Sequence, residues 1–75
     1  MKTIDEVLKS IRPEFDFTAS GDFIADGMLD SFDVVTLVSE LDRNYGISIA
    51  GIDIVPENFR NKSAIESLLA RYTRP

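Results

Sequence analysis

Residues 30–46 read DSFDVVTLVSELDRNYG, and this stretch carries the strongest helical pattern in the chain. Asp30 is a good N-cap residue, and Asp33 falls in the first turn, where a carboxylate is favoured. Gly46 suits a left-handed helix end. The apolar residues recur at helical spacing on one stripe, which predicts the face that packs on the core. This core stripe consists of Val34, Leu37, Val38, Leu41 and Tyr45.

The opposite side of the same helix is polar, with two apolar exceptions near its start. At about 100° per residue, Phe32 and Val35 fall on the outer side, away from the core stripe. An outward apolar side chain can be an anchor for a partner, or it can be covered by a neighbouring loop. The polar residues predicted on the outer side are Asp33, Thr36, Ser39, Glu40 and Arg43.

A helix is predicted at the N-terminal end, followed by a long loop. Thr3 and Glu6 form a capping box, and Pro13 ends the helix near Arg12. The loop at 13–29 is longer than the usual connection, and loops of this length tend to be functional. Its irregularly spaced aromatic residues are expected to pin it to the core, and they are Phe15, Phe17 and Phe23.

The C-terminal half is predicted to hold a connector, a short helix and a last amphipathic helix. Residues 47–55 alternate like a strand, but a lone strand has nothing to pair with. We therefore expect an extended connector whose isoleucines enter the core. Pro56 begins a short helical turn through Phe59, and Ser63 with Glu66 forms a capping box for the last helix.

Composition limits the function classes. With 75 residues the chain has room for one domain, residues 1–75, and the predicted fold is all-α, three main helices plus one short helix. The chain has no cysteine and no histidine, which excludes disulfides, cysteine nucleophiles and the Ser-His-Asp triad. With so few catalytic side chains, we do not expect an enzyme. No apolar run could span a bilayer and residues 1–20 lack a signal-peptide core, so we expect a cytoplasmic protein that is not inserted in a membrane.

The charge pattern bears on partners. The net charge is −5, so nucleic acid is not expected as a partner, because its phosphates would be repelled. Residues 26–45 carry five acidic residues against Arg43, a net −4, and residues 60–75 carry four basic residues against Glu66, a net +3. An acidic middle predicts a basic partner surface docking there, although charge also serves solubility alone.

The long loop carries part of a calcium-binding pattern. If Asp22 begins a calcium-binding loop, Gly27 stands at the required glycine position. Ile24 then stands where an oxygen ligand is needed, and Asp33 takes the place of the bidentate Glu. No metal site is expected.

Ser31 has an unusual setting, because it ends a long loop and begins a helix. The free amides and the dipole of a helix N-terminus favour negative charge, so a serine here could bear a phosphodiester. With no histidine in the chain, Ser31 has no base that would make it a hydrolytic nucleophile. The attachment would therefore be made by another enzyme.

Residues 27–49 combine a loop glycine, an Asp-Ser-large apolar triplet, an amphipathic helix and an aromatic-Gly-Ile ending. The residues that carry this pattern are Gly27-Met28-Leu29-Asp30-Ser31-Phe32, Val35, Leu37-Val38, Leu41 and Tyr45-Gly46-Ile47-Ser48-Ile49. In this order they resemble the acyl carrier protein family. The resemblance continues to the last helix, which Ser63 opens as a Thr or Ser does in the family, and it implies a small four-helix bundle of acyl-carrier type.

The resemblance implies that Ser31 bears 4′-phosphopantetheine, transferred from coenzyme A by a separate holo-carrier-protein synthase. The thiol of that arm would carry acyl or aminoacyl groups as thioesters between loading and transferring enzymes, with the carrier a monomer. Asp30 would cap the helix and meet the synthase. The implied docking surface has apolar anchors and an acidic rim, namely Phe32 and Val35 with Asp33, Glu40 and Asp42.

The cargo stays open between a fatty acyl group, an amino acid such as D-alanine and a specialised acyl group. Thr36, Ser39 and Arg43 stand where carriers of fatty acid synthesis commonly have acids or Met. The segment at 56–59 and the G-M-L-D-S-F form are similar to stand-alone carriers such as D-alanyl carrier proteins, although the tryptophan that these often show is missing. The alternative function is an unmodified acidic helical docking module.

Overall fold

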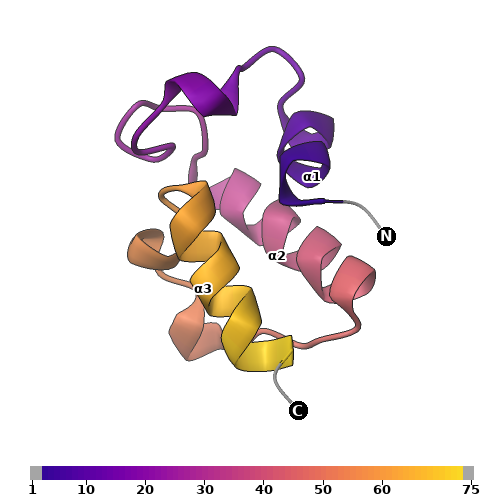
Figure 1. Cartoon of the computed structure of the whole chain (residues 1–75). Coiled ribbons are helices and arrows are strands. Elements are labelled where there is room, and N and C mark those ends of the chain that lie inside the picture. The colour runs from indigo at the N-terminus through magenta and orange to yellow at the C-terminus, as the bar shows by residue number, and fades with distance from the viewer. Residues whose placement is uncertain (1–2, 74–75) are drawn as a thin grey trace.

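The computed structural model describes residues 3–73, and this part of the chain is all-helical, with no strand. Three main helices are therefore confirmed, and a short 3-10 helix lies where the short fourth helix was predicted (Figure 1). None of the helices in residues 3–73 has the length and hydropathy needed to cross a bilayer. The α-helices are α1 (Ile4–Ile11), α2 (Ser31–Tyr45) and α3 (Lys62–Thr73), and the 3-10 helices are η1 (Phe17–Ala19), η2 (Gly51–Asp53) and η3 (Pro56–Asn58).

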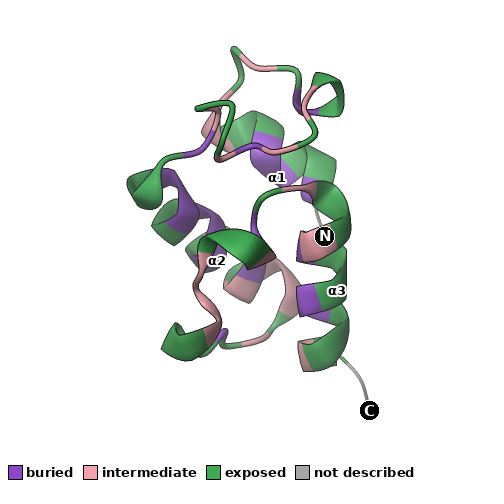
Figure 2. Cartoon of the chain, turned by 90° about the vertical axis from the view of Figure 1, so that its left-hand side faces the viewer, coloured by how far each residue is buried: buried purple, intermediate pink, exposed green. Residues whose placement is uncertain are grey.

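The core lies between the three α-helices, since α1 packs against both α2 and α3. Figure 2 shows the buried parts of the helices facing inward and the exposed parts facing outward. Burial of one aliphatic side chain contributes about 1.5–3 kcal/mol to the free energy of folding, so the core stripe of α2 holds this helix against the core. Of the predicted core stripe, Val34, Leu37, Val38 and Leu41 are buried, and Tyr45 is half-buried against the core.

The first helix and the long loop follow the prediction. The Thr3 hydroxyl accepts the Glu6 N–H at 3.2 Å, and the Thr3 N–H donates to Glu6 Oε1 at 3.0 Å, which completes the capping box. In the loop, Phe17 and Phe23 are buried edge to face with ring centroids 5.0 Å apart. Phe15 is half-buried beside Phe17. The aromatic residues therefore attach this long loop to the core.

The connector differs from the prediction at one isoleucine. Ile49 is buried and Ile47 and Ile54 pack partly against the core, as expected. Ile52 is 86% exposed. It lies in η2, where the chain turns at about three residues per turn, so the strand-like alternation does not continue through it.

The start of the last helix was predicted two residues too late. The helix begins at Lys62, and Asn61 caps it, because the Asn61 side chain accepts the Ala64 N–H at 2.7 Å. Ser63 is inside the helix, so the predicted Ser63–Glu66 capping box is wrong. Asn is as good an N-cap as Ser, and here it holds the position.

Candidate functional site

Ser31 is the first residue of α2, and its side chain is exposed. Asp30 caps the helix as predicted: its Oδ1 accepts the Asp33 N–H at 2.8 Å. In return the Asp30 N–H donates to Asp33 Oδ2 at 3.2 Å. The two aspartates thus form a reciprocal capping box that fixes the backbone on both sides of Ser31.

The long loop delivers the chain to Ser31 through a turn at Gly27. Gly27 has φ +74°, in the left-handed region that favours glycine. The N–H groups of Met28 and Leu29 then both donate to the carbonyl of Phe23, at 2.8 and 3.1 Å, and Leu29 is buried. The left-handed backbone at Gly27 favours glycine, which explains the loop glycine of the sequence pattern four residues before Ser31.

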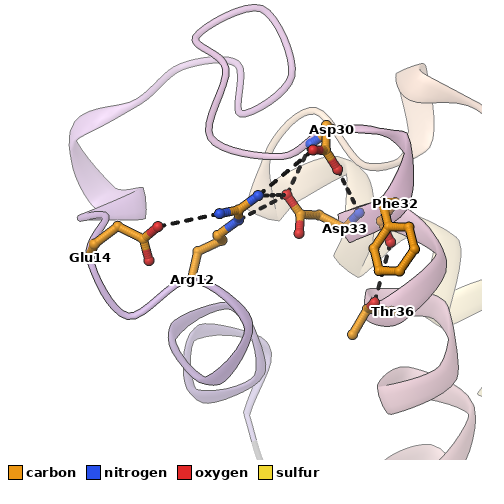
Figure 3. Close-up of polar contacts among 6 residues, drawn as sticks. All are labelled: Arg12, Glu14, Asp30, Phe32, Asp33 and Thr36. Carbon is orange, nitrogen blue, oxygen red and sulfur yellow. Dashed lines mark hydrogen bonds and ion pairs between the residues drawn. The ribbon is translucent and has the colours of Figure 1, made fainter.

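Arg12, the residue after α1, contacts the same turn, as Figure 3 shows. Its Nε and Nη2 each lie 2.9 Å from Asp33 Oδ2. Its Nη2 lies 3.7 Å from Asp30 Oδ2, and its Nη1 lies 3.4 Å from Glu14 Oε2. The sequence predicts Arg12 only as the end of the first helix, because no local pattern joins residues 21 positions apart.

Asp33 is buried, with 7% of its surface exposed. Burial alone would raise the pKa of its carboxyl, but the hydrogen bond from Arg12 and the bond from the Asp30 backbone outweigh it and hold that pKa below its ordinary value. The same hydrogen bond with Asp33 raises the pKa of the Arg12 guanidinium. Asp33 is therefore a buried carboxylate that is kept ionised by the guanidinium of Arg12, the residue that follows α1.

The predicted acidic rim needs correction. Asp33 does not lie on the outer face, because its side chain turns back to the helix start and pairs with Arg12. Glu40 is bound to Arg43 at 2.7 Å, and Asp42 accepts the Ile49 N–H at 3.0 Å. The rim is thus wrong at Asp33, and its other two carboxylates hold partners within the chain.

The two apolar exceptions on α2 do project outward. Phe32 is 79% exposed and Val35 is 61% exposed, so no loop covers them. The Phe32 ring points away from the Arg12 cluster, and its carbonyl accepts the Thr36 hydroxyl at 3.2 Å (Figure 3). These side chains form an apolar surface next to Ser31.

A cleft of about 320 Å³ adjoins Ser31. Its walls come from the long loop, the first turns of α2 and the connector that leads into η3, and they are mainly aliphatic. The lining of this cleft comes from three separate segments, so no single stretch of the sequence predicts it. The lining residues are Ile24, Asp30, Ser31, Val34, Val35, Ile54, Val55 and Pro56.

The arrangement offers an exposed hydroxyl at a helix N-terminus beside an apolar cleft. A group attached to Ser31 would have its phosphate at the helix end and room for an apolar arm in the cleft. No group of three or more acidic side chains in residues 3–73 is arranged to hold a metal ion. Comparison of the chain with family models, with curated proteins and with solved structures finds no match.

Proposed function

We propose that this protein is a carrier whose Ser31 bears 4′-phosphopantetheine, donated by coenzyme A. The observation that carries the proposal is that Ser31, exposed at the first position of α2, lines an apolar cleft of about 320 Å³. When attached, the group supplies a thiol that holds an acyl or aminoacyl cargo as a thioester. The chain has no Cys, so the thiol sulfur belongs to the attached group. In the transfer the Ser31 oxygen forms a bond to the pantetheine-side phosphorus of coenzyme A, the diphosphate bond breaks and adenosine 3′,5′-bisphosphate leaves, while in this proposal the synthase supplies the base that takes the hydroxyl proton.

The residues around Ser31 fit such a group. The aliphatic walls of the cleft suit the apolar part of the arm, and the helix N-terminus suits its phosphate. Arg12 offsets the charge of Asp33, which reduces the repulsion that the acidic residues would exert on an anionic substituent. In this proposal the fold is a four-helix bundle of acyl-carrier type in which η3 is the short helix.

The partners in this proposal are a holo-carrier-protein synthase and the enzymes that load and transfer the cargo, all in the cytoplasm. Phe32 and Val35 are the apolar anchors that these enzymes would bind, because both are large, exposed and close in sequence to Ser31. The same exposure favours a second candidate, a docking module that never carries a prosthetic group. The two candidates differ in whether Ser31 is modified.

A thiol titration tests the proposal, because a chain without cysteine has no background thiol. We expect incubation with coenzyme A and a broad-specificity holo-synthase, followed by desalting, to yield one titratable thiol per chain. The Ser31→Ala variant should yield none, and Ser63→Ala, which changes another exposed serine, should behave as the wild type. A wild-type protein that gains no thiol would favour the docking module.

A further inference from the structure

The first turn of α2 is held from outside the helix by one side chain. Two hydrogen bonds converge on Asp33 Oδ2, one from Arg12 Nε at 2.9 Å and one from the Asp30 N–H at 3.2 Å. Arg12 Nη2 forms an ion pair with the same oxygen at 2.9 Å. The oxygen that binds the Asp30 backbone is therefore the same oxygen that Arg12 holds. Arg12 and the backbone of Asp30, the residue directly before Ser31, are thus linked through one carboxylate oxygen.

We propose that Arg12 is a positioning residue for Ser31, which keeps the first turn of α2 ordered by holding Asp33 against the backbone of Asp30. The inference rests on the proposed modification of Ser31. Arg12 binds carboxylates and not the serine, so it acts on Ser31 through Asp33 and Asp30 (Figure 3).

The burial of Asp33 explains why the turn depends on Arg12. Without the guanidinium, a carboxylate that is 7% exposed would keep only the N–H of Asp30 as partner for its Oδ2. A buried charge with so little compensation moves toward water or takes up a proton. Either change loosens the reciprocal bonds between Asp30 and Asp33, so the first turn is open in part of the population.

A partly open turn has a specific kinetic consequence. If the synthase binds only the ordered turn, the apparent affinity falls in proportion to the ordered fraction, while the step after binding is unchanged. Loss of Arg12 should therefore raise the KM for the carrier and leave kcat as it is. Partial unfolding of the whole chain would raise KM in the same way, so the kinetic change is read together with amide exchange, which should be faster in this turn and not across the chain.

The test compares Arg12→Gln with Lys62→Gln. Lys62 pairs with Asp5 at 2.7 Å and joins α3 to α1, so its variant makes the same change in net charge without touching Asp30 or Asp33. Three quantities are measured: kcat and KM for phosphopantetheine transfer with the carrier as varied substrate, and the rate of amide hydrogen exchange at Asp30, Asp33 and Val34, whose N–H groups donate within this turn. In Arg12→Gln we expect KM to rise about threefold or more, kcat to stay within about twofold, and the amides of Asp30, Asp33 and Val34 to exchange faster. Lys62→Gln should leave all three unchanged.

Two further variants keep the test sharp if Arg12→Gln folds poorly. Arg12→Lys keeps the positive charge but lacks the planar guanidinium that places two nitrogens 2.9 Å from Asp33 Oδ2. Its KM should therefore fall between those of wild type and Arg12→Gln. The double variant Arg12→Gln/Asp33→Asn should return toward the wild-type KM, because a neutral amide needs no cation and can still accept the Asp30 N–H.

Amide exchange at Asp30, Asp33 and Val34 that is unchanged in both Arg12→Gln and Arg12→Lys would overturn the role of Arg12, whether or not Ser31 is modified. A KM equal to that of the wild type in a folded Arg12→Gln variant would overturn it as well. A wild-type protein that is never modified would instead overturn the proposed function, and the exchange measurement would still decide the role of Arg12.

Discussion

Arg12 and Asp33 are 21 positions apart, and the guanidinium of one lies 2.9 Å from the carboxylate of the other. This contact joins the end of α1 to the first turn of α2, where Ser31 lies. Because the Asp33 carboxylate is buried, removing Arg12 alone should destabilise the site more than replacing both partners, although the Arg12 side chain itself is 35% exposed. The stability of the site is thus tied to a contact between two helices.

The pair makes part of the stability depend on pH. The pKa of Asp33 is lower in the folded state than its ordinary value of 3.8, so the contribution is present above that value and lost as the pH falls through the folded-state pKa. We expect the difference in urea midpoint between wild type and Asp33→Asn to be largest near neutral pH and to shrink below about pH 3.8.

Urea titrations of both proteins from pH 7 to acid measure this difference. The comparison with Asp33→Asn is needed because the bonds from the Thr18 hydroxyl and N–H also lower the pKa of Asp16, which adds its own acid dependence to both proteins. A difference that stays constant across the range would contradict the ionised, bound state of Asp33.

The cap of α2 predicts different effects for two adjacent residues. Asp30→Ala removes the carboxylate that accepts the Asp33 N–H, and should cost about 1 kcal/mol of unfolding free energy. Ser31→Ala changes an exposed side chain and should alter stability by less than about 0.5 kcal/mol. Denaturant midpoints decide, and equal losses would mean that the capping role of Asp30 is wrong.

Phe32 and Phe59 give a matched pair of aromatic truncations. Phe59 is fully buried, so Phe59→Ala should cost about 3–5 kcal/mol. Phe32 is 79% exposed, so Phe32→Ala should leave the thermal midpoint nearly unchanged and should slow the modification of Ser31. A normal modification rate in Phe32→Ala would remove Phe32 from the docking surface.

The start of α3 allows a direct test of the corrected cap. Asn61→Ala removes the acceptor of the Ala64 N–H and should cost about 1 kcal/mol, while Ser63→Ala should be nearly neutral. The two variants are compared by chemical denaturation. The reverse order would restore Ser63 as the cap.

The elements that the sequence predicted correctly depend on local patterns. The capping box at Thr3, the cap at Asp30 and the left-handed ending at Gly46 each involve residues within one turn of each other. The outward placement of Phe32 and Val35 follows from helical spacing alone. Such features are visible in a sequence because their partners are three or four positions away.

The elements that the sequence did not predict depend on contacts between distant segments. Helical spacing predicts Asp33 on the outer face, because it takes no account of the ion pair with Arg12, a residue far away in the sequence. The cleft beside Ser31 needs Ile24 and Val55, which come from different loops. Tyr72 likewise binds distant groups, since its hydroxyl donates to Asp53 and accepts the Ala50 N–H at 3.0 Å.

Whether Ser31 carries the proposed phosphopantetheine group is measured by the intact mass of the protein. Purified protein is incubated with coenzyme A and a broad-specificity holo-synthase, with Ser31→Ala treated in parallel as the matched control. We predict that the wild-type mass increases by one phosphopantetheine group and that the Ser31→Ala mass does not change. Two results would contradict the attachment of this group to Ser31. One is an unchanged wild-type mass under conditions in which the synthase modifies a known carrier, and the other is an equal increase in the mass of Ser31→Ala.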